Sequence, residues 1–299
     1  DPDAGVLPGA LGRRSPGNRL ILRARLVAAA LAFALVGCQS TTLPEPVEGP
    51  EPTATIPVTT PTTPGPVEGP ARTSTQYGSL TASGLSTTDR AAWMQRIEQA
   101  ARTVRTAEIV AAVGPDWPGR LDVVIAADVD EFTSRTGTPA DAASAATICT
   151  DGASEIVVNP AVLIAADQWL RSTLVHEGVH VATASACVPS GESLGWATEG
   201  LAESVAAGAD PSTASRNHKL VIDYLASHAL PEKLPSELNT LTDYALAQLA
   251  VDQVIKRQGR QADDFLARAI RQAAKVAQAE HERVRSWYVA ELRRLADGG

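Results

Sequence analysis

The chain has 299 residues, of which 44% are hydrophobic and 20% are charged, and its formal net charge is −8. These proportions are typical of globular proteins and exclude a collagen-like repeat or disorder along the whole chain. Proteins that bind nucleic acids normally carry a basic face, so the negative balance indicates that no nucleic acid is bound. Three cysteines without a Cys-x-x-Cys spacing also exclude a cysteine-rich zinc site.

Residues 1–37 have the composition of a targeting segment. Five arginines and no acidic residue lie in 13–25, and an apolar run, too short to span a membrane, follows from 26 to 36. The run ends in Gly37-Cys38 and resembles the lipobox of bacterial lipoproteins. This resemblance implies cleavage before Cys38, a lipid on that cysteine, and an extracytoplasmic domain anchored to the bacterial cell membrane. An ordinary signal peptide with a chance cysteine is the alternative.

Residues 38–85 are rich in proline, threonine and glycine. Nine of the 20 prolines lie between Pro44 and Pro70, where Pro-Val-Glu-Gly-Pro occurs twice. Such a segment contains too little apolar surface to offset the chain entropy that is lost on folding. We therefore expect a disordered tether that separates the next domain from the membrane. A threonine-rich stalk for sugars, or a segment that binds a cell-wall partner, is the alternative.

Residues 86–299 have mostly helical periodicity and are expected to form one domain. Two short apolar runs, at 121–126 and 155–158, predict buried strands. Few strands followed by many helices predict an α+β domain, in which a small N-terminal sheet lies beside a helical body. The expected helices run from Thr87 or Thr88 to just before Gly114, around Phe132, and over 167–185, 196–207, 212–229, 240–258, 261–277 and 279–296.

The strongest motif is His176-Glu177-Gly178-Val179-His180, within one of the expected helices. Histidines four residues apart lie on one helical face, where both can bind a single metal ion. The glutamate beside the first histidine can act as a general base on a water at that metal. On these five residues alone, two solvent-facing histidines on an amphipathic helix are the alternative.

A hydrolytic zinc site needs a third protein ligand. After 18 intervening residues, His180 is followed by Glu199 in the stretch Trp-Ala-Thr-Glu-Gly-Leu-Ala-Glu, which ends at Glu203. This stretch resembles the gluzincin metallopeptidases, in which a second helix reading W-x-x-E-G-x-A-E supplies a glutamate ligand. The resemblance implies a Zn²⁺ ion held by His176, His180 and Glu199. It also implies that Glu177 is the general base and that Glu203 hydrogen-bonds a ligand histidine.

Gluzincins use a tyrosine or histidine on a later helix to stabilise the oxyanion. Tyr244 lies at the start of the stretch that resembles this helix, and we expect it to have that role. Tyr224, His218 and His228 are alternatives.

Cys149 and Cys187 remain once Cys38 is assigned to the lipid. An extracytoplasmic compartment permits oxidation, and a bridge between them would connect the motif helix to the neighbouring strand region. Two separate buried thiols are the alternative. Neither cysteine has a ligand-type spacing, so a catalytic role is not expected.

More loosely, residues 86–296 resemble the peptidase-MA-like domain of bacterial secreted proteins. The likeness lies in the strand–helix unit 121–137, the strand that ends at Asn159-Pro160, and the stretch 244–259. It implies that the last strand before the motif helix is an edge strand beside the active site. An extended peptide can add to such an edge by backbone pairing.

Together these features predict a membrane-tethered, extracytoplasmic zinc metallopeptidase that hydrolyses a peptide or protein substrate. One alternative is a catalytically inactive lipoprotein that keeps the metallopeptidase fold and binds cell-envelope partners. An intact Glu177 disfavours this alternative, since a binding module has no need of a general base. The other alternative is an amidase that acts on cell-wall peptides. Nothing in the sequence favours one oligomeric state.

Overall fold

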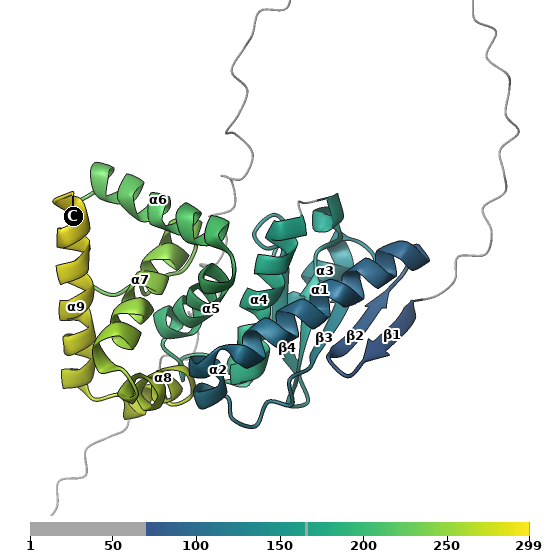
Figure 1. The fold of residues 1–299 in the computed structure, drawn as a ribbon, viewed down its shortest axis with the longest axis horizontal. Helices are drawn as coiled ribbons and strands as arrows, with labels where there is room; N and C mark the ends of the chain where they lie inside the picture. The colour runs from purple at the N-terminus through teal and green to yellow at the C-terminus, as the bar shows by residue number, and fades with distance from the viewer. Residues whose placement is uncertain (1–69, 165–166, 299) are drawn as a thin grey trace, which may run out of the picture.

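The computed structural model describes residues 70–164 and 167–298 (Figure 1). The predicted signal segment, Cys38 and most of the predicted tether lie outside these residues. The described part has the predicted α+β class, with five strands and nine α-helices. No helix within it combines the length and the apolar character that are needed to cross a membrane.

The five strands form one mixed sheet in the order β1-β2-β3-β5-β4. An antiparallel hairpin joins β1 (Ala71–Thr75) to β2 (Gly78–Ala82). Next come β3 (Leu121–Ile125), parallel to β2, and β5 (Ala153–Val158), parallel to β3. The last strand, β4 (Ala145–Thr150), pairs antiparallel with β5. The two edge strands are therefore β1 and β4.

Two expectations about this sheet are wrong. Strands β1 and β2 lie inside 38–85, so the regular structure begins at Ala71 and not at 86. The last strand before the motif helix, β5, is an inner strand and not an edge strand. The chain folds back between β4 and β5 at Asp151 and Gly152, whose φ values of 52° and 80° are typical of a type I′ turn. The turn pairs β4 with β5, and β3 already pairs with the other edge of β5, so β4 is the edge strand of the sheet.

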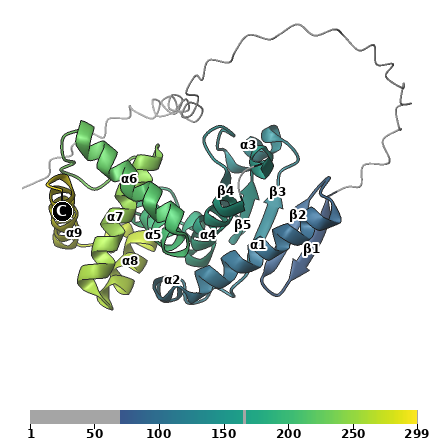
Figure 2. The ribbon, with the colours of Figure 1, turned by 45° about the horizontal axis from the view of Figure 1, so that its top comes forward.

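Each face of the sheet is covered by different helices (Figures 1 and 2). Side chains alternate along a strand, so Ile156 joins the main core while Val157 points to the other face. The main core packs against α1 (Thr87–Thr106) and α4 (Asp167–Thr183). On the other face, Phe132 of α3 (Val129–Thr136) packs against Val157.

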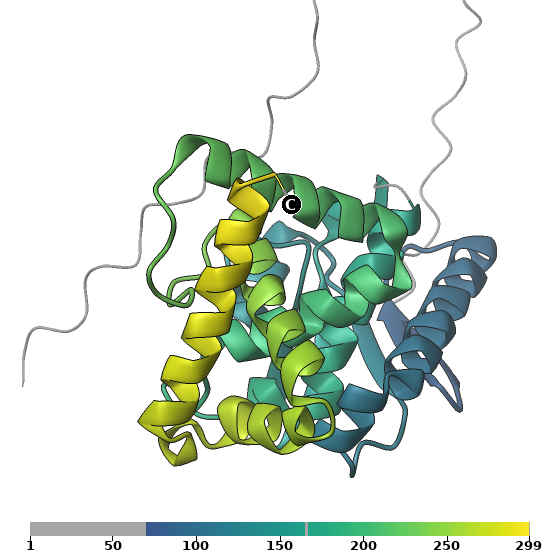
Figure 3. The same cartoon turned by 60° about the vertical axis from the view of Figure 1, so that its left-hand side comes forward.

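The rest of the chain forms a helical region on the far side of α4 from the sheet (Figures 1 and 3). Close packing within it depends on Gly200, because a Cβ there would collide with the Ala247 carbonyl. This region consists of α5 (Gly195–Ala209), α6 (Pro211–Ser227), α7 (Leu241–Gln258), α8 (Gln261–Arg271) and α9 (Gln278–Ala296).

Helix ends differ from the predicted ones at two places. The first expected helix is broken at Ala107, whose extended backbone separates α1 from α2 (Glu108–Val113) and lets Val113 of α2 enter the core. The helix expected over 261–277 stops at Arg271, since Gln272 leaves the helical conformation. Short 3-10 turns lie at Pro160–Ile164, Ser185–Cys187 and Ala273–Lys275.

Candidate metal centre

The helix α4 carries the motif between the sheet and the helical region. Its glycine, Gly178, faces α1 and β3, where a Cβ would lie 3.0 Å from Val104 and 3.3 Å from Leu121. Packing of this face against the core turns the two histidines toward α5. The motif helix is therefore fixed by its apolar side, and the side that carries His176 and His180 faces the helical region.

The three predicted ligands come together around one point. Nε2 of His176 lies 3.2 Å from Nε2 of His180 and 3.2 Å from Oε2 of Glu199. Nε2 of His180 lies 3.3 Å from the same oxygen. These residues form a group that can hold a metal ion. In a tetrahedral site with bonds of about 2.0–2.1 Å, ligand atoms lie roughly 3.3 Å apart, so the observed spacing fits.

Charge at the site favours a cation. Burial lowers the pKa of His176, but Glu199 and Glu203 outweigh it and raise that pKa well above its ordinary value. Burial also raises the pKa of Glu199, yet His180 and His176 outweigh it and hold that pKa far below its usual range. Positive charge is therefore stabilised in contact with these carboxylates, as a bound cation requires.

Each ligand histidine has an oxygen facing its other ring nitrogen. Nδ1 of His176 lies 3.3 Å from Oε1 of Glu203, within ion-pair distance although the ring N–H is not aligned for a good hydrogen bond. Nδ1 of His180 lies 3.0 Å from the hydroxyl of Ser185. The sequence prediction missed Ser185, which is brought back toward the helix by the left-handed residue Ala184. Such contacts orient the imidazole rings toward a metal.

Behind Glu203, a chain of polar groups runs between α5, α6 and α7. Asn217 donates from Nδ2 to Glu203 Oε2 at 2.8 Å and to Gln248 Oε1 at 2.7 Å. Gln248 donates in turn to Asp252 Oδ2 at 3.2 Å, and Ser204 donates to Asp252 Oδ1 at 2.6 Å. Gln248 accepts from Asn217 through its oxygen and donates to Asp252 through its nitrogen, so Asp252 orients the Gln248 amide and the Asn217 amino group faces Glu203.

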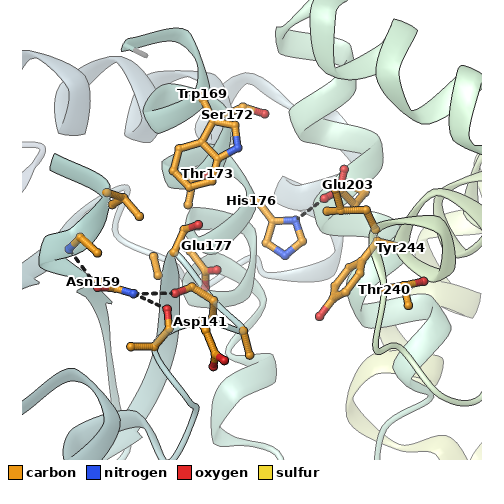
Figure 4. A pocket seen from close by; sticks show the side chains of 18 of the residues that line it. Asp141, Asn159, Trp169, Ser172, Thr173, His176, Glu177, Glu203, Thr240 and Tyr244 are labelled. Atoms are coloured by element: carbon orange, nitrogen blue, oxygen red, sulfur yellow. Dashed lines mark hydrogen bonds and ion pairs between the residues drawn. The ribbon is translucent and has the colours of Figure 1, made fainter. Parts of the chain in front are cut away.

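The predicted general base, Glu177, lies on the sheet side of His176, and Tyr244 lies on the opposite side (Figure 4). The Glu177 side chain is buried. Its carboxylate accepts a hydrogen bond of 2.7 Å from the hydroxyl of Thr147 on β4. Sequence reasoning missed Thr147 because it did not predict β4.

A pocket of about 340 Å³ opens beside the motif (Figure 4). Trp169 of α4, Arg216 of α6 and Tyr244 of α7 contribute to its lining, together with the segment 140–145 that leads into β4. This segment is held in place by Asn159, which donates to two of its carbonyls at 2.6 and 3.1 Å. The pocket therefore lies between the sheet region and the helical region, next to the three grouped ligand residues.

Of the four residues considered for oxyanion stabilisation, Tyr244 is the one that lines this pocket. Its ring centroid lies 6.1 Å from that of His176. Burial, followed by the charge of Glu199, raises the pKa of Tyr244 above its ordinary value, so the hydroxyl keeps its proton. Tyr224 instead stacks on His228, and His218 is exposed.

The predicted bridge between Cys149 and Cys187 is confirmed. It joins β4 to the 3-10 turn that follows α4, and the hydroxyl of Ser154 lies 3.4 Å from Cys187 Sγ. The bridge therefore fastens the edge strand to the C-terminal end of the motif helix.

Comparison with known proteins adds no family to this description. No protein-family model matches the chain, and no curated protein matches its sequence.

Proposed function

We propose that this protein is a zinc metallopeptidase that hydrolyses peptide bonds. The observation that supports this most strongly is the common contact of His176, His180 and Glu199, with Glu177 facing the adjoining pocket. Two imidazole nitrogens and one carboxylate oxygen form a ligand set that suits zinc and leaves a fourth position for water or substrate. When bound, zinc supplies a Lewis acid that lowers the pKa of water to about 7.

Residues of the chain transfer the proton, stabilise the oxyanion and orient the ligand histidines. Glu177 accepts a proton from the attacking water and delivers it to the leaving amine as the C–N bond breaks. Tyr244 donates a hydrogen bond to the oxyanion, because its raised pKa keeps the hydroxyl protonated. Glu203 and Ser185 hold the two ligand histidines in the orientation that points Nε2 at the common centre.

The substrate that fits this arrangement is an extended peptide. The edge strand β4 begins at Ala145, which lines the pocket, and among the described residues it pairs along one edge, with β5, so its outer edge can pair with another strand. Backbone pairing would hold the substrate beside Glu177 whatever its side chains, and the pocket of about 340 Å³ would accept one of them.

We also propose that the protein is anchored to the bacterial cell membrane by a lipid on Cys38 and acts outside the cytoplasm. The lipobox-like sequence supports this proposal. Growth with labelled palmitate should label the wild-type protein and leave C38S unlabelled. Equal labelling of both proteins would contradict the anchor.

The enzymatic proposal is tested by metal content and hydrolysis together. The purified protein should contain about one zinc ion per chain and should cleave members of a mixed peptide library until a chelator is added. The variant E177Q should keep the zinc and lose at least about 100-fold in rate, because only the base is removed. Absence of bound zinc would overturn the proposal.

A parallel incubation with peptidoglycan separates the alternatives. Release of cell-wall peptides without cleavage of the library would indicate the amidase. Zinc binding without cleavage of either substrate would indicate a binding protein with a metallopeptidase fold.

A further inference from the structure

A threonine hydroxyl from a different part of the fold contacts the proposed base. Thr147 lies 30 residues before Glu177, on the edge strand β4, and its Oγ1 lies 2.7 Å from Glu177 Oε2. The same hydroxyl lies 3.1 Å from the Glu177 backbone carbonyl. It carries one hydrogen, and the shorter distance and the negative charge both favour the carboxylate as its acceptor.

The position of this hydroxyl is fixed by the strand that carries it. Residues two apart on a strand point to the same face, so Thr147 and Cys149 both face α4. Cys149 is bonded to Cys187 beyond the end of α4, and Thr147 contacts Glu177 within it. The edge strand is therefore connected to the motif helix at two points. The backbone that carries the hydroxyl is thereby held beside Glu177.

A general base is efficient only when its carboxylate is held within reach of the proton it removes. Glutamate has several rotatable bonds, and the hydrogen bond from Thr147 removes much of this freedom. Ser185 and Glu203 contact the ligand histidines, whereas Thr147 contacts the group that moves the proton.

We propose that Thr147 is a positioning residue for Glu177, and that the substrate-side strand β4 thereby sets the geometry of proton transfer. This inference rests on the proposed peptidase function. It assigns Thr147 an effect on turnover, with no effect on metal binding and little on substrate affinity.

The test compares T147V, which keeps the shape and removes the hydroxyl, with T147S, which keeps the hydroxyl. The control is T150V, which makes the same change at an exposed position on the same strand. We expect T147V to lower kcat about 10-fold with KM and zinc affinity unchanged, because a hydrogen bond to a charged group is lost. T147S should recover most of the wild-type kcat, and T150V should behave as wild type.

Two results would overturn the inference. One is a T147V enzyme with wild-type kcat. The other is an equal loss of kcat in T147S and T147V, which would indicate a packing role. If the zinc-loaded wild-type protein hydrolyses nothing, the proposed function is wrong, but the role of Thr147 can still be tested. Crystal structures of wild type, T147V and T147S would then be compared. The inference requires the Glu177 carboxylate to move in T147V and to stay in place in T147S.

Discussion

On its sheet side, α4 is held by apolar packing, one hydroxyl and one disulfide, whereas on its helical side it contacts buried charged and polar groups. The sheet side contributes Thr147 and the bridge from Cys149. The helical side contributes Glu199, Glu203 and the Asn217 amide behind them. The difference follows from what each side must do. Buried charges require partners, and Glu199, Glu203 and the polar groups behind Glu203 lie on the helical side, whereas Ser185, which contacts His180, lies in the turn after α4.

The comparison suggests that metal affinity and turnover are controlled from different sides of one helix. Changes on the helical side should alter zinc binding, while changes on the sheet side should alter the base and the stability of the edge strand.

The largest expected effect comes from the disulfide on the sheet side. Replacing both Cys149 and Cys187 by serine should lower the free energy of unfolding by about 3 kcal/mol, since the bridge closes a loop with a sequence separation of 38. Urea denaturation of the oxidised protein and of the double variant measures this difference. Zinc affinity of the folded variant should stay within about 3-fold of wild type, because neither cysteine contacts a ligand residue and Ser185, which shares the turn with Cys187, keeps its own contact with His180. A large loss of zinc affinity would contradict the division.

The next effect belongs to Tyr244, which lies on the helical side but points into the pocket. Y244F should lower kcat about 100-fold, since an oxyanion donor is lost, and should leave zinc affinity unchanged. Y224F is the matched control, because Tyr224 stacks on His228 away from the pocket. A loss of kcat at unchanged zinc affinity would show that, on the helical side, only the groups that contact the ligand residues affect zinc affinity. Equal activities of Y244F and Y224F would remove Tyr244 from the mechanism.

The sequence predicts the grouped residues His176, His180 and Glu199 far better than the contacts on the sheet side of α4. His176 and His180 follow from local helical spacing, whereas Glu199 follows from the resemblance of the stretch around it to the gluzincin pattern. Strand β4 was missed because its residues, Ala-Ala-Thr-Ile-Cys-Thr, have no clear apolar alternation. The Asp151-Gly152 pair was the available signal, since this dipeptide favours the turn that joins two strands of a hairpin.

Strands β1 and β2 were missed for another reason. They are short and contain one large apolar side chain, Leu80, so the end of the proline run at Pro70 was the only local signal that separates them from the segment before. Their formation depends on pairing with β3, which is a tertiary contact. The same holds for Thr147 and Asn217, whose partners lie 30 and 14 residues away and are chosen by the fold.

A smaller effect is expected from Asn217 on the helical side. N217L should weaken zinc binding about 5- to 10-fold, because Glu203 loses the hydrogen bond from Asn217, keeps only the longer ion pair with Arg216 at 3.5 Å, and no longer holds His176 as firmly. Competition with a chromogenic chelator measures the affinity, and T147V is the control from the sheet side. Equal zinc affinities in N217L and T147V would show that the chain behind Glu203 serves stability alone.

The smallest effect concerns Asp210, which joins the start of α4 to the helical region without touching the metal ligands. Its carboxylate caps α6 through Ser212 and accepts a 2.6 Å hydrogen bond from Gln168 of α4. Burial raises the pKa of Asp210, but these hydrogen bonds outweigh it and lower that pKa to about 2.

A pKa that is lower in the folded protein gives stability that is complete above the unfolded value, near 4, and is lost as the pH falls toward 2. D210N should therefore be less stable than wild type by about 1 kcal/mol at pH 7, because asparagine still caps the helix but carries no charge. The two proteins should converge in urea midpoint between pH 4 and pH 2. D223N is the control, since Asp223 is exposed and pairs with Lys219 at the surface. If the difference in urea midpoint between wild type and D210N stays constant down to pH 2, the shape of the Asp210 side chain, and not its charge, stabilises the contact between α4 and the helical region.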